Sequence, residues 1–261
     1  MKKLLILLLV TSLGFGFLSG RAASPAAERP TYFELKVYHL KTARQEALID
    51  SFLQRQYLPA LHAAGLPTIG VFKPLGNDTT ADRRVYVFVP FTSLKQWEKV
   101  EKETTTKLLA SGGAYVDAAY TTPAYGRKEA IFLKAFEAMT GLAAPKLTTP
   151  KSERVYELRS YEGASEKIFR NKVQMFNAGG EIKLFDRLGF NGIFYGEVLF
   201  GSKTPNLMYM TSFENMVARD AHWKTFGSDP EWKALSARPE HQHNVSHIDI
   251  TFLCPTPYSD L

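Results

Sequence analysis

The sequence lacks most features that reveal chemistry directly. Among its 261 residues there is one cysteine, Cys254, so an intramolecular disulfide is excluded. The pairs Gly112-Gly113 and Gly179-Gly180 have neither the strand–turn–helix setting nor the lysine of a phosphate-binding loop. No serine lies in a nucleophile-elbow pattern. The fold must therefore be held together by packing, and no motif specifies a reaction.

A strong excess of charge is also missing. The formal net charge is +6, from 32 lysines and arginines against 26 acidic residues. Without the first 22 residues, which hold Lys2, Lys3 and Arg21, 29 basic residues against 26 acidic ones leave +3. So weak and evenly spread a charge gives no reason to expect nucleic acid or an anionic membrane as a partner.

The one long apolar stretch lies at the N-terminus. Residues 1–22 combine a basic start, an apolar run over 4–10 and small residues at the end, which is typical of a secretory signal peptide cut near Ala22 or Ala23. Thr11 and several glycines interrupt the run, so a permanent membrane span is disfavoured, although an uncleaved anchor is the alternative. We therefore expect an exported protein, periplasmic or secreted, with no integral membrane span after processing.

The rest of the chain reads as one unit built twice. Residues 31–38 (TYFELKVY) and 154–161 (RVYELRSY) share the pattern Glu-Leu-basic-x-Tyr. Each begins a series with the order strand, helix, strand, strand, helix, strand. We predict an α+β fold of two tandem ferredoxin-like (βαββαβ) domains that form a pseudo-dimeric α/β barrel. The first domain spans 31–137, a linker 138–152, and the second domain 153–261.

Local signals indicate where the helices begin and end. Helical spacing of leucines and Phe52 over 43–64 ends at Gly65. Ser165 is a suitable cap for a helix in the second half, and Gly179-Gly180 in the middle of that helix predicts a bend. Asp229 followed by proline indicates a further helical start.

Strand alternation separates Tyr156 and Leu158 from Glu157, Arg159 and Tyr161. We assign the polar set to the helix-free face, which would line the barrel interior, and the same argument adds polar groups from three other strands. The expected ligand-binding residues are Glu157, Arg159, Tyr161, Tyr195, Tyr209 and Asp249. Weak catalytic candidates on the same face are Glu197 and His247.

A structural interpretation competes with this site. The charged groups could neutralise one another as cross-strand pairs, and buried tyrosines often form structural hydrogen bonds. The face could also be the contact between the two half-barrels, and no nucleophile–base–orienter set stands out. His241-x-His243 with His247 has metal-like spacing, but Pro239 predicts a loop there and Glu240 is the one acidic neighbour, so no metal or cofactor is expected.

The order of several short motifs in the second half resembles the NIPSNAP family. These motifs are Glu157-Leu158-Arg159-x-Tyr161, Met175-Phe176-Asn177, Gly179-Gly180-Glu181, Phe194-Tyr195-Gly196-Glu197, Pro205-Asn206-Leu207-x-Tyr209-Met210, Ser228-Asp229-Pro230-Glu231-Trp232 and Pro255-Thr256-Pro257-Tyr258-Ser259. The resemblance covers residues 153–261. The first half carries a weaker one, through Glu34-Leu35-Lys36, Tyr125-x-Arg127 and Ala135-Phe136-Glu137. The NIPSNAP resemblance implies a dimeric α/β-barrel fold and brings no established catalytic residues.

Three functions remain open at this point. The first is an exported NIPSNAP-like protein, of a bacterial-type branch, whose barrel interior binds a small aromatic or planar molecule among the tyrosines, with Arg159 orienting an acidic group. The second is an enzyme resembling a cofactor-independent monooxygenase or an isomerase, with Glu197 or His247 as base. The third is a non-catalytic envelope protein that works by protein contact. Free outer strands could also pair two chains in a homodimer.

Overall fold

The computed structural model describes residues 31–261, so the predicted signal peptide, residues 1–22, lies outside the described part of the chain. Within that part the sheet has eight strands. They are β1 (Tyr32–Leu40), β2 (Gly70–Pro74), β3 (Arg83–Phe91), β4 (Arg127–Ala135), β5 (Val155–Glu162), β6 (Asn191–Phe200), β7 (Asn206–Phe213) and β8 (His247–Pro255).

The strands close into a single barrel in the order β1-β3-β2-β8-β5-β7-β6-β4. Every neighbouring pair is antiparallel. Each half contributes four adjacent strands, with its fourth strand beside its first, then its third, then its second. The β2–β8 and β4–β6 pairs join the halves, so the fold is a mixed α/β protein built on a closed eight-stranded antiparallel barrel.

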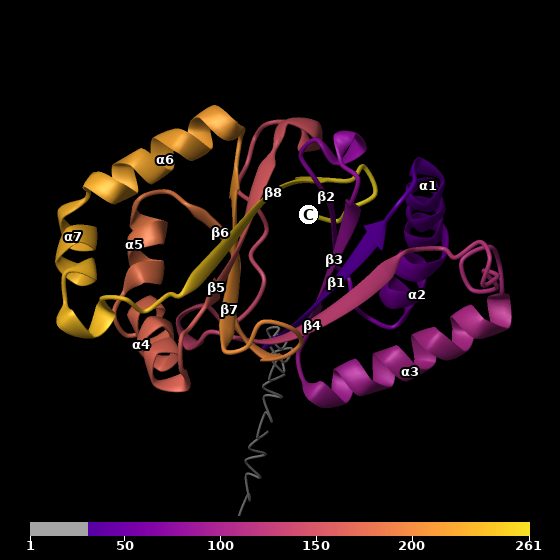
Figure 1. Cartoon of the computed structure of the whole chain (residues 1–261), viewed down its shortest axis with the longest axis horizontal. Helices are drawn as coiled ribbons and strands as arrows, with labels where there is room; N and C mark the ends of the chain where they lie inside the picture. Colours follow the sequence, from indigo (N-terminus) through magenta and orange to yellow (C-terminus); the bar gives the residue numbers. More distant parts are fainter. Residues whose placement is uncertain (1–30) are drawn as a thin grey trace, which may run out of the picture.

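The helices of the two halves lie on opposite sides of this barrel (Figure 1). They are α1 (Ala43–Phe52), α2 (Leu58–Ala63), α3 (Leu94–Ser111), α4 (Glu166–Phe176), α5 (Glu181–Arg187), α6 (Met216–Ser228) and α7 (Pro230–Ser236). A π-helical turn, Leu53–Tyr57, connects α1 to α2 without a break, and Gly65 follows with φ of 87°. The predicted bend separates α4 from α5, where Gly180 takes the left-handed φ of 92° that suits glycine.

The barrel interior is apolar and takes side chains from all eight strands. One continuous cluster of buried residues lines it: Phe33, Leu35, Val37, Phe72, Tyr86, Phe88, Ile131, Leu133, Ala135, Tyr156, Leu158, Ile193, Phe194, Val198, Met208, Met210, Leu253 and Leu261. Two further clusters lie between the outside of the barrel and the helices, one in each half. The molecule therefore has three apolar layers, and the innermost belongs to both halves.

This arrangement corrects the predicted orientation of β5. Tyr156 and Leu158 point into the barrel, whereas Tyr161 belongs to the cluster beneath the helices and Glu157 bonds to side chains of α6. The prediction that Glu157, Arg159 and Tyr161 line the interior is wrong. Alternation divides a strand into two sets correctly, but it does not say which set faces inward. Here α6 supplies the partners that make burial of the polar set under helices favourable.

Candidate functional site

One end of the barrel is filled with aromatic rings and the other is hollow. At the filled end, Phe33, Phe88 and Phe194 contact one another with ring centroids 4.4–5.4 Å apart. At the other end, six strands surround a cavity of about 520 Å³. It lies where β1 and β5 end and where β3, β4, β7 and β8 begin. Because strands alternate in direction around the sheet, residues distant in the sequence meet at this opening.

The inner wall of the cavity is apolar, whereas its outer part carries polar and charged side chains. Its inner part is lined by Leu35, Val37, Tyr86, Ile131, Leu158 and Met208. One polar pair interrupts this surface: the Ser160 hydroxyl and the Asn206 amide are buried and bonded to each other at 2.9 and 3.2 Å. An amide has more donor and acceptor capacity than one hydroxyl uses. The pair can therefore also form a hydrogen bond with a molecule in the cavity.

A histidine between two carboxylates lies at the mouth. His39 Nδ1 is 3.0 Å from Asp82 Oδ1, and His39 Nε2 is 2.7 Å from Glu129 Oε1. Carboxylates accept hydrogen bonds only, so the doubly protonated ring satisfies both contacts at once. His39 and Glu129 both line the cavity. The sequence did not indicate either residue, because the site residues expected from it all lie in the second half of the chain, whereas His39 and Glu129 belong to β1 and β4 of the first half.

The remaining charges at the mouth are paired as well. Lys203, on the loop between β6 and β7, bonds to Asp249 of β8, and the Lys203 ammonium lowers the pKa of that carboxyl. Arg84 bonds to Asp82 at 2.7 Å. Lys203 takes a left-handed φ of 68°, an uncommon conformation for a lysine. The mouth thus carries charges of both signs without a strong excess of either.

The predicted site residues are distributed over different surfaces. Asp249 lines the barrel cavity, and the exposed His247 lies at its mouth, with Nε2 3.2 Å from Asp249 Oδ1. Tyr195 and Tyr209 lie beneath the helices of the second half. Glu197 is ion-paired with Arg170 of α4, which places it outside the barrel. The predicted interior position is therefore wrong for these three residues, because β6 and β7 turn the same polar face toward the helices as β5 does.

Glu157 is the centre of a buried polar network between β5 and α6. Its fully buried carboxylate accepts hydrogen bonds from Arg159 at 2.6 Å, Arg219 at 2.8 Å and the Trp223 indole at 2.7 Å. Burial alone would raise the pKa of Glu157, but the two guanidinium groups and the indole outweigh it and lower that pKa. The Arg159 guanidinium also stacks 3.9 Å from the Trp223 ring. The network thus joins β5 to α6.

The first half contains a counterpart of this network. Glu34 accepts a hydrogen bond from the Trp97 indole at 3.3 Å and lies 3.3 Å from the Lys36 ammonium. The same ammonium bonds to Glu101 at 2.6 Å and to Tyr57 at 2.7 Å. In each half, then, a glutamate and a cation two residues apart on the first strand meet a tryptophan of a flanking helix. These contacts connect sheet to helices and leave the barrel cavity free.

A group with metal-like geometry occurs at the mouth. Glu162, His247 and Asp249 place ligand atoms within 4.8 Å of one another, and it is the one such group found in residues 31–261. His247 is exposed, and Asp249 is already paired with Lys203. His241 instead bonds through Nδ1 to the Leu235 carbonyl at 2.9 Å. Apart from this proximity of ligand atoms, nothing in residues 31–261 indicates a cation at the mouth.

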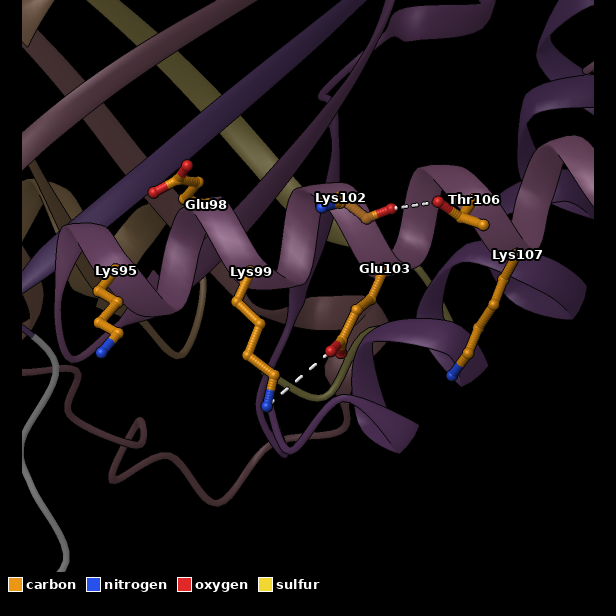
Figure 2. A pocket seen from close by; sticks show the side chains of 7 residues that line it. All are labelled: Lys95, Glu98, Lys99, Lys102, Glu103, Thr106 and Lys107. Atoms are coloured by element: carbon orange, nitrogen blue, oxygen red, sulfur yellow. Dashed lines mark hydrogen bonds and ion pairs between the residues drawn. The ribbon is translucent and has the colours of Figure 1, made fainter.

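A hollow on α3 has a different character. Its lining residues are Lys95, Glu98, Lys99, Lys102, Glu103, Thr106 and Lys107, which all belong to that helix. Figure 2 shows their side chains projecting from the helix, with the Lys99 ammonium near the Glu103 carboxylate at 3.9 Å. Since one helix supplies every lining residue, this is an exposed helix face of mixed charge and not an enclosed site.

Together these features define the class of the molecule: an α/β protein whose closed antiparallel barrel is filled at one end and hollow at the other. Residues 156–260 match the model of the NIPSNAP family. The second half of the chain is therefore a NIPSNAP domain, as the sequence motifs indicated. A comparison with curated protein sequences finds no match.

In residues 31–261 no helix has the length and apolarity needed to cross a membrane.

Two solved structures share the fold at low sequence identity, and a third matches less than half of this chain. A proposed monooxygenase of Fusobacterium nucleatum is 6% identical with a TM-score of 0.56, and the match covers 87% of this chain and 93% of that one. An anthrone oxidase-like protein is 11% identical with a TM-score of 0.54, covering 88% and 92%. A NIPSNAP family protein of Agrobacterium tumefaciens is 19% identical with a TM-score of 0.37, covering 45% and 98%.

Proposed function

We propose that this protein binds a small aromatic or otherwise planar molecule in the cavity at the open end of the barrel. The observation that supports this is the cavity itself: about 520 Å³, apolar inside, with the Ser160–Asn206 pair in its wall and charged groups at its mouth. Ligand sites in proteins commonly have this size and combine apolar surface with polar groups that orient the ligand. Of the predicted ligand-binding residues, Asp249 lies in position to contact such a molecule.

The polar contacts available to such a ligand differ from those expected from the sequence. Arg159 lies beneath α6 and bonds to Glu157, so it does not orient an acidic group on the ligand. The cations at the mouth, Arg84 and Lys203, are already paired with carboxylates. The best-fitting ligand therefore has an apolar ring system inside the barrel and an uncharged polar group near Asn206.

The repeated strand order and the paired glutamate–cation–tryptophan networks support two fused ferredoxin-like units, 31–137 and 153–261, joined by 138–152. The leader over residues 1–22 supports export to the periplasm or beyond. An exported binding protein would meet its ligand outside the cytoplasm.

The test is to fill the cavity and measure binding. We expect 2-naphthol to bind the wild-type protein by calorimetry, and Met208→Trp to weaken binding at least about tenfold because the larger side chain occupies the ligand's volume. Val217→Trp, at a position 79% exposed on α6, is the matched control and should bind like wild type. Equal affinity in all three proteins, with Met208→Trp still folded, would exclude the cavity as the binding site.

A second candidate function is catalysis of the cofactor-independent monooxygenase type. The specific observation is His39, held between Asp82 and Glu129 at the cavity mouth, where it can exchange a proton with a bound molecule. One structural neighbour is named for anthrone oxidation, so anthrone and dissolved O₂, which give anthraquinone and water, are suitable probes. We expect anthraquinone formation to fall in His39→Gln and to persist in Glu197→Gln. A rate equal to the protein-free reaction would remove this candidate.

A further inference from the structure

A second, smaller cavity lies outside the barrel in the second half. It measures about 290 Å³ and lies between the segment 138–146, α5 and the beginning of β6. Main-chain hydrogen bonds fasten the segment to β6: Ala143 N donates to Ile193 O at 3.1 Å, and Phe136 N donates to Tyr195 O at 3.0 Å. The segment is thus held against β6 beside the cavity.

The Tyr195 hydroxyl lies at this cavity without a partner. The side chain is 1% exposed, and its ring stacks on Tyr209 with centroids 5.5 Å apart. Tyr161 and Tyr209 bond to each other at 2.9 Å, but no described residue forms a hydrogen bond with the Tyr195 hydroxyl. Buried tyrosine hydroxyls usually have a partner. The Tyr195 oxygen itself is accessible from the cavity, so a molecule bound there can supply the hydrogen-bond partner.

A glycine keeps this hydroxyl accessible. Gly192 also lines the cavity, and a Cβ atom at that position would lie 2.8 Å from the Tyr195 hydroxyl oxygen and 2.7 Å from a ring carbon. Any other residue at 192 would therefore cover the hydroxyl or displace the ring. This close approach explains why position 192 is a glycine. It also leaves the Tyr195 hydroxyl at the cavity wall.

The surroundings restrict the chemistry of the partner. Burial raises the pKa of Tyr195, and the nearby Glu181 and Asp186 carboxylates raise it further, so the hydroxyl stays protonated and can donate. The same carboxylates disfavour an anion at the hydroxyl, while Lys146 and Lys183 also line the cavity, so its charges are mixed and favour neither an anion nor a cation. Ile182 and Phe190 make part of the wall apolar. A neutral molecule with one acceptor oxygen satisfies all three conditions.

We propose that this cavity is a second ligand site, in which the Tyr195 hydroxyl donates a hydrogen bond to the carbonyl oxygen of a neutral molecule of single-ring size, such as an aryl ketone. The site is separate from the barrel cavity, because Tyr195 faces the helices and Met208 faces the interior. It therefore does not depend on the function proposed above.

The experiment uses acetophenone as the probe, with binding followed by ligand-observed NMR. Tyr195→Phe should weaken binding about five- to tenfold, the usual effect of losing one neutral hydrogen bond, and should leave the ligand-free melting temperature unchanged. Ala144→Phe, which places a ring at the cavity wall, should abolish binding while Tyr195 is intact. Met208→Trp should bind like wild type, because it fills the other cavity.

Each opposite result overturns the proposal. Absence of acetophenone binding to the wild-type protein would do so. Wild-type affinity for acetophenone in both Tyr195→Phe and Ala144→Phe would do so as well. A melting temperature lowered in Tyr195→Phe would show that the hydroxyl has a structural partner. Loss of binding in Met208→Trp alone would assign the probe to the barrel cavity.

Discussion

At the scale of single residues, the polar groups of β5 show how a buried charge is made compatible with a core. Glu157 has no contact with solvent, yet two guanidinium groups and one indole surround it. Removal of the glutamate charge would leave Arg159 beneath the helices without a counter-charge and would leave Arg219 with the exposed Asp220 as its remaining carboxylate partner. Such losses destabilise far more than the loss of an exposed ion pair.

We therefore expect Glu157→Gln to lower the free energy of unfolding by about 3–5 kcal/mol, measured by urea denaturation. Glu197→Gln is the matched control, because its partner Arg170 is exposed, and it should cost less than about 1 kcal/mol. A similar, small loss in both variants would mean that the network around Glu157 contributes little to stability.

The pH dependence of the same pair of proteins gives an independent check. The pKa of Glu157 is lower in the folded protein than in the unfolded chain, whose glutamate pKa is about 4.3. The stability from this carboxylate is therefore fully present above about pH 4.3 and is lost as the pH falls through the lower folded-state pKa. The stability difference between wild type and Glu157→Gln should shrink in that acidic range. A difference that grows on acidification would contradict the lowered pKa.

At the scale of elements, local signals set where helices begin and end, whereas tertiary contacts accompany features that have no local signal. Ser93 begins α3 as a cap: its hydroxyl accepts a hydrogen bond from Gln96 N at 3.1 Å. Gly179-Gly180 separates α4 from α5 as predicted, since Gly180 adopts a conformation that other residues reach only with strain. The π-helical turn Leu53–Tyr57 was not predicted; there, Tyr57 extends to the Lys36 ammonium. That contact is tertiary and has no local sequence signal.

Ser93→Ala should lower the free energy of unfolding by about 1 kcal/mol, because it removes the cap of the longest helix. Ser111→Ala, at the other end of α3, is the control; the exposed Ser111 hydroxyl bonds only to the Lys107 carbonyl within its helix, so the change should stay within about 0.5 kcal/mol. The midpoint of urea unfolding measures both. A larger loss for Ser111→Ala would show that the cap is not the main local contribution.

At the scale of the whole molecule, neither half can complete the barrel alone. The innermost apolar cluster takes residues from both halves, and the β2–β8 and β4–β6 pairs close the sheet. Half a barrel would expose that apolar face and two unpaired strand edges to water. The stability of each half therefore depends on the other, because the two halves close one barrel together.

We expect fragments 31–152 and 153–261 to form a 1:1 complex when mixed, and the second fragment alone to self-associate. Light scattering after size-exclusion chromatography would distinguish these states, with the intact chain as the reference. A well-folded, monomeric fragment 153–261 would show that its interior face is stable without a partner surface.

The sequence by itself determined the order of the elements, the main helix boundaries and the NIPSNAP resemblance, because these depend on local periodicity, caps and glycines. It did not determine which face of β5 points inward, where the barrel is hollow, or that His39, Glu129 and Asp249 meet at one mouth. These were decided by tertiary structure: side-chain alternation is the same for either face, and the choice depends on partners such as Arg219 and Trp223, which lie more than sixty residues away in the chain.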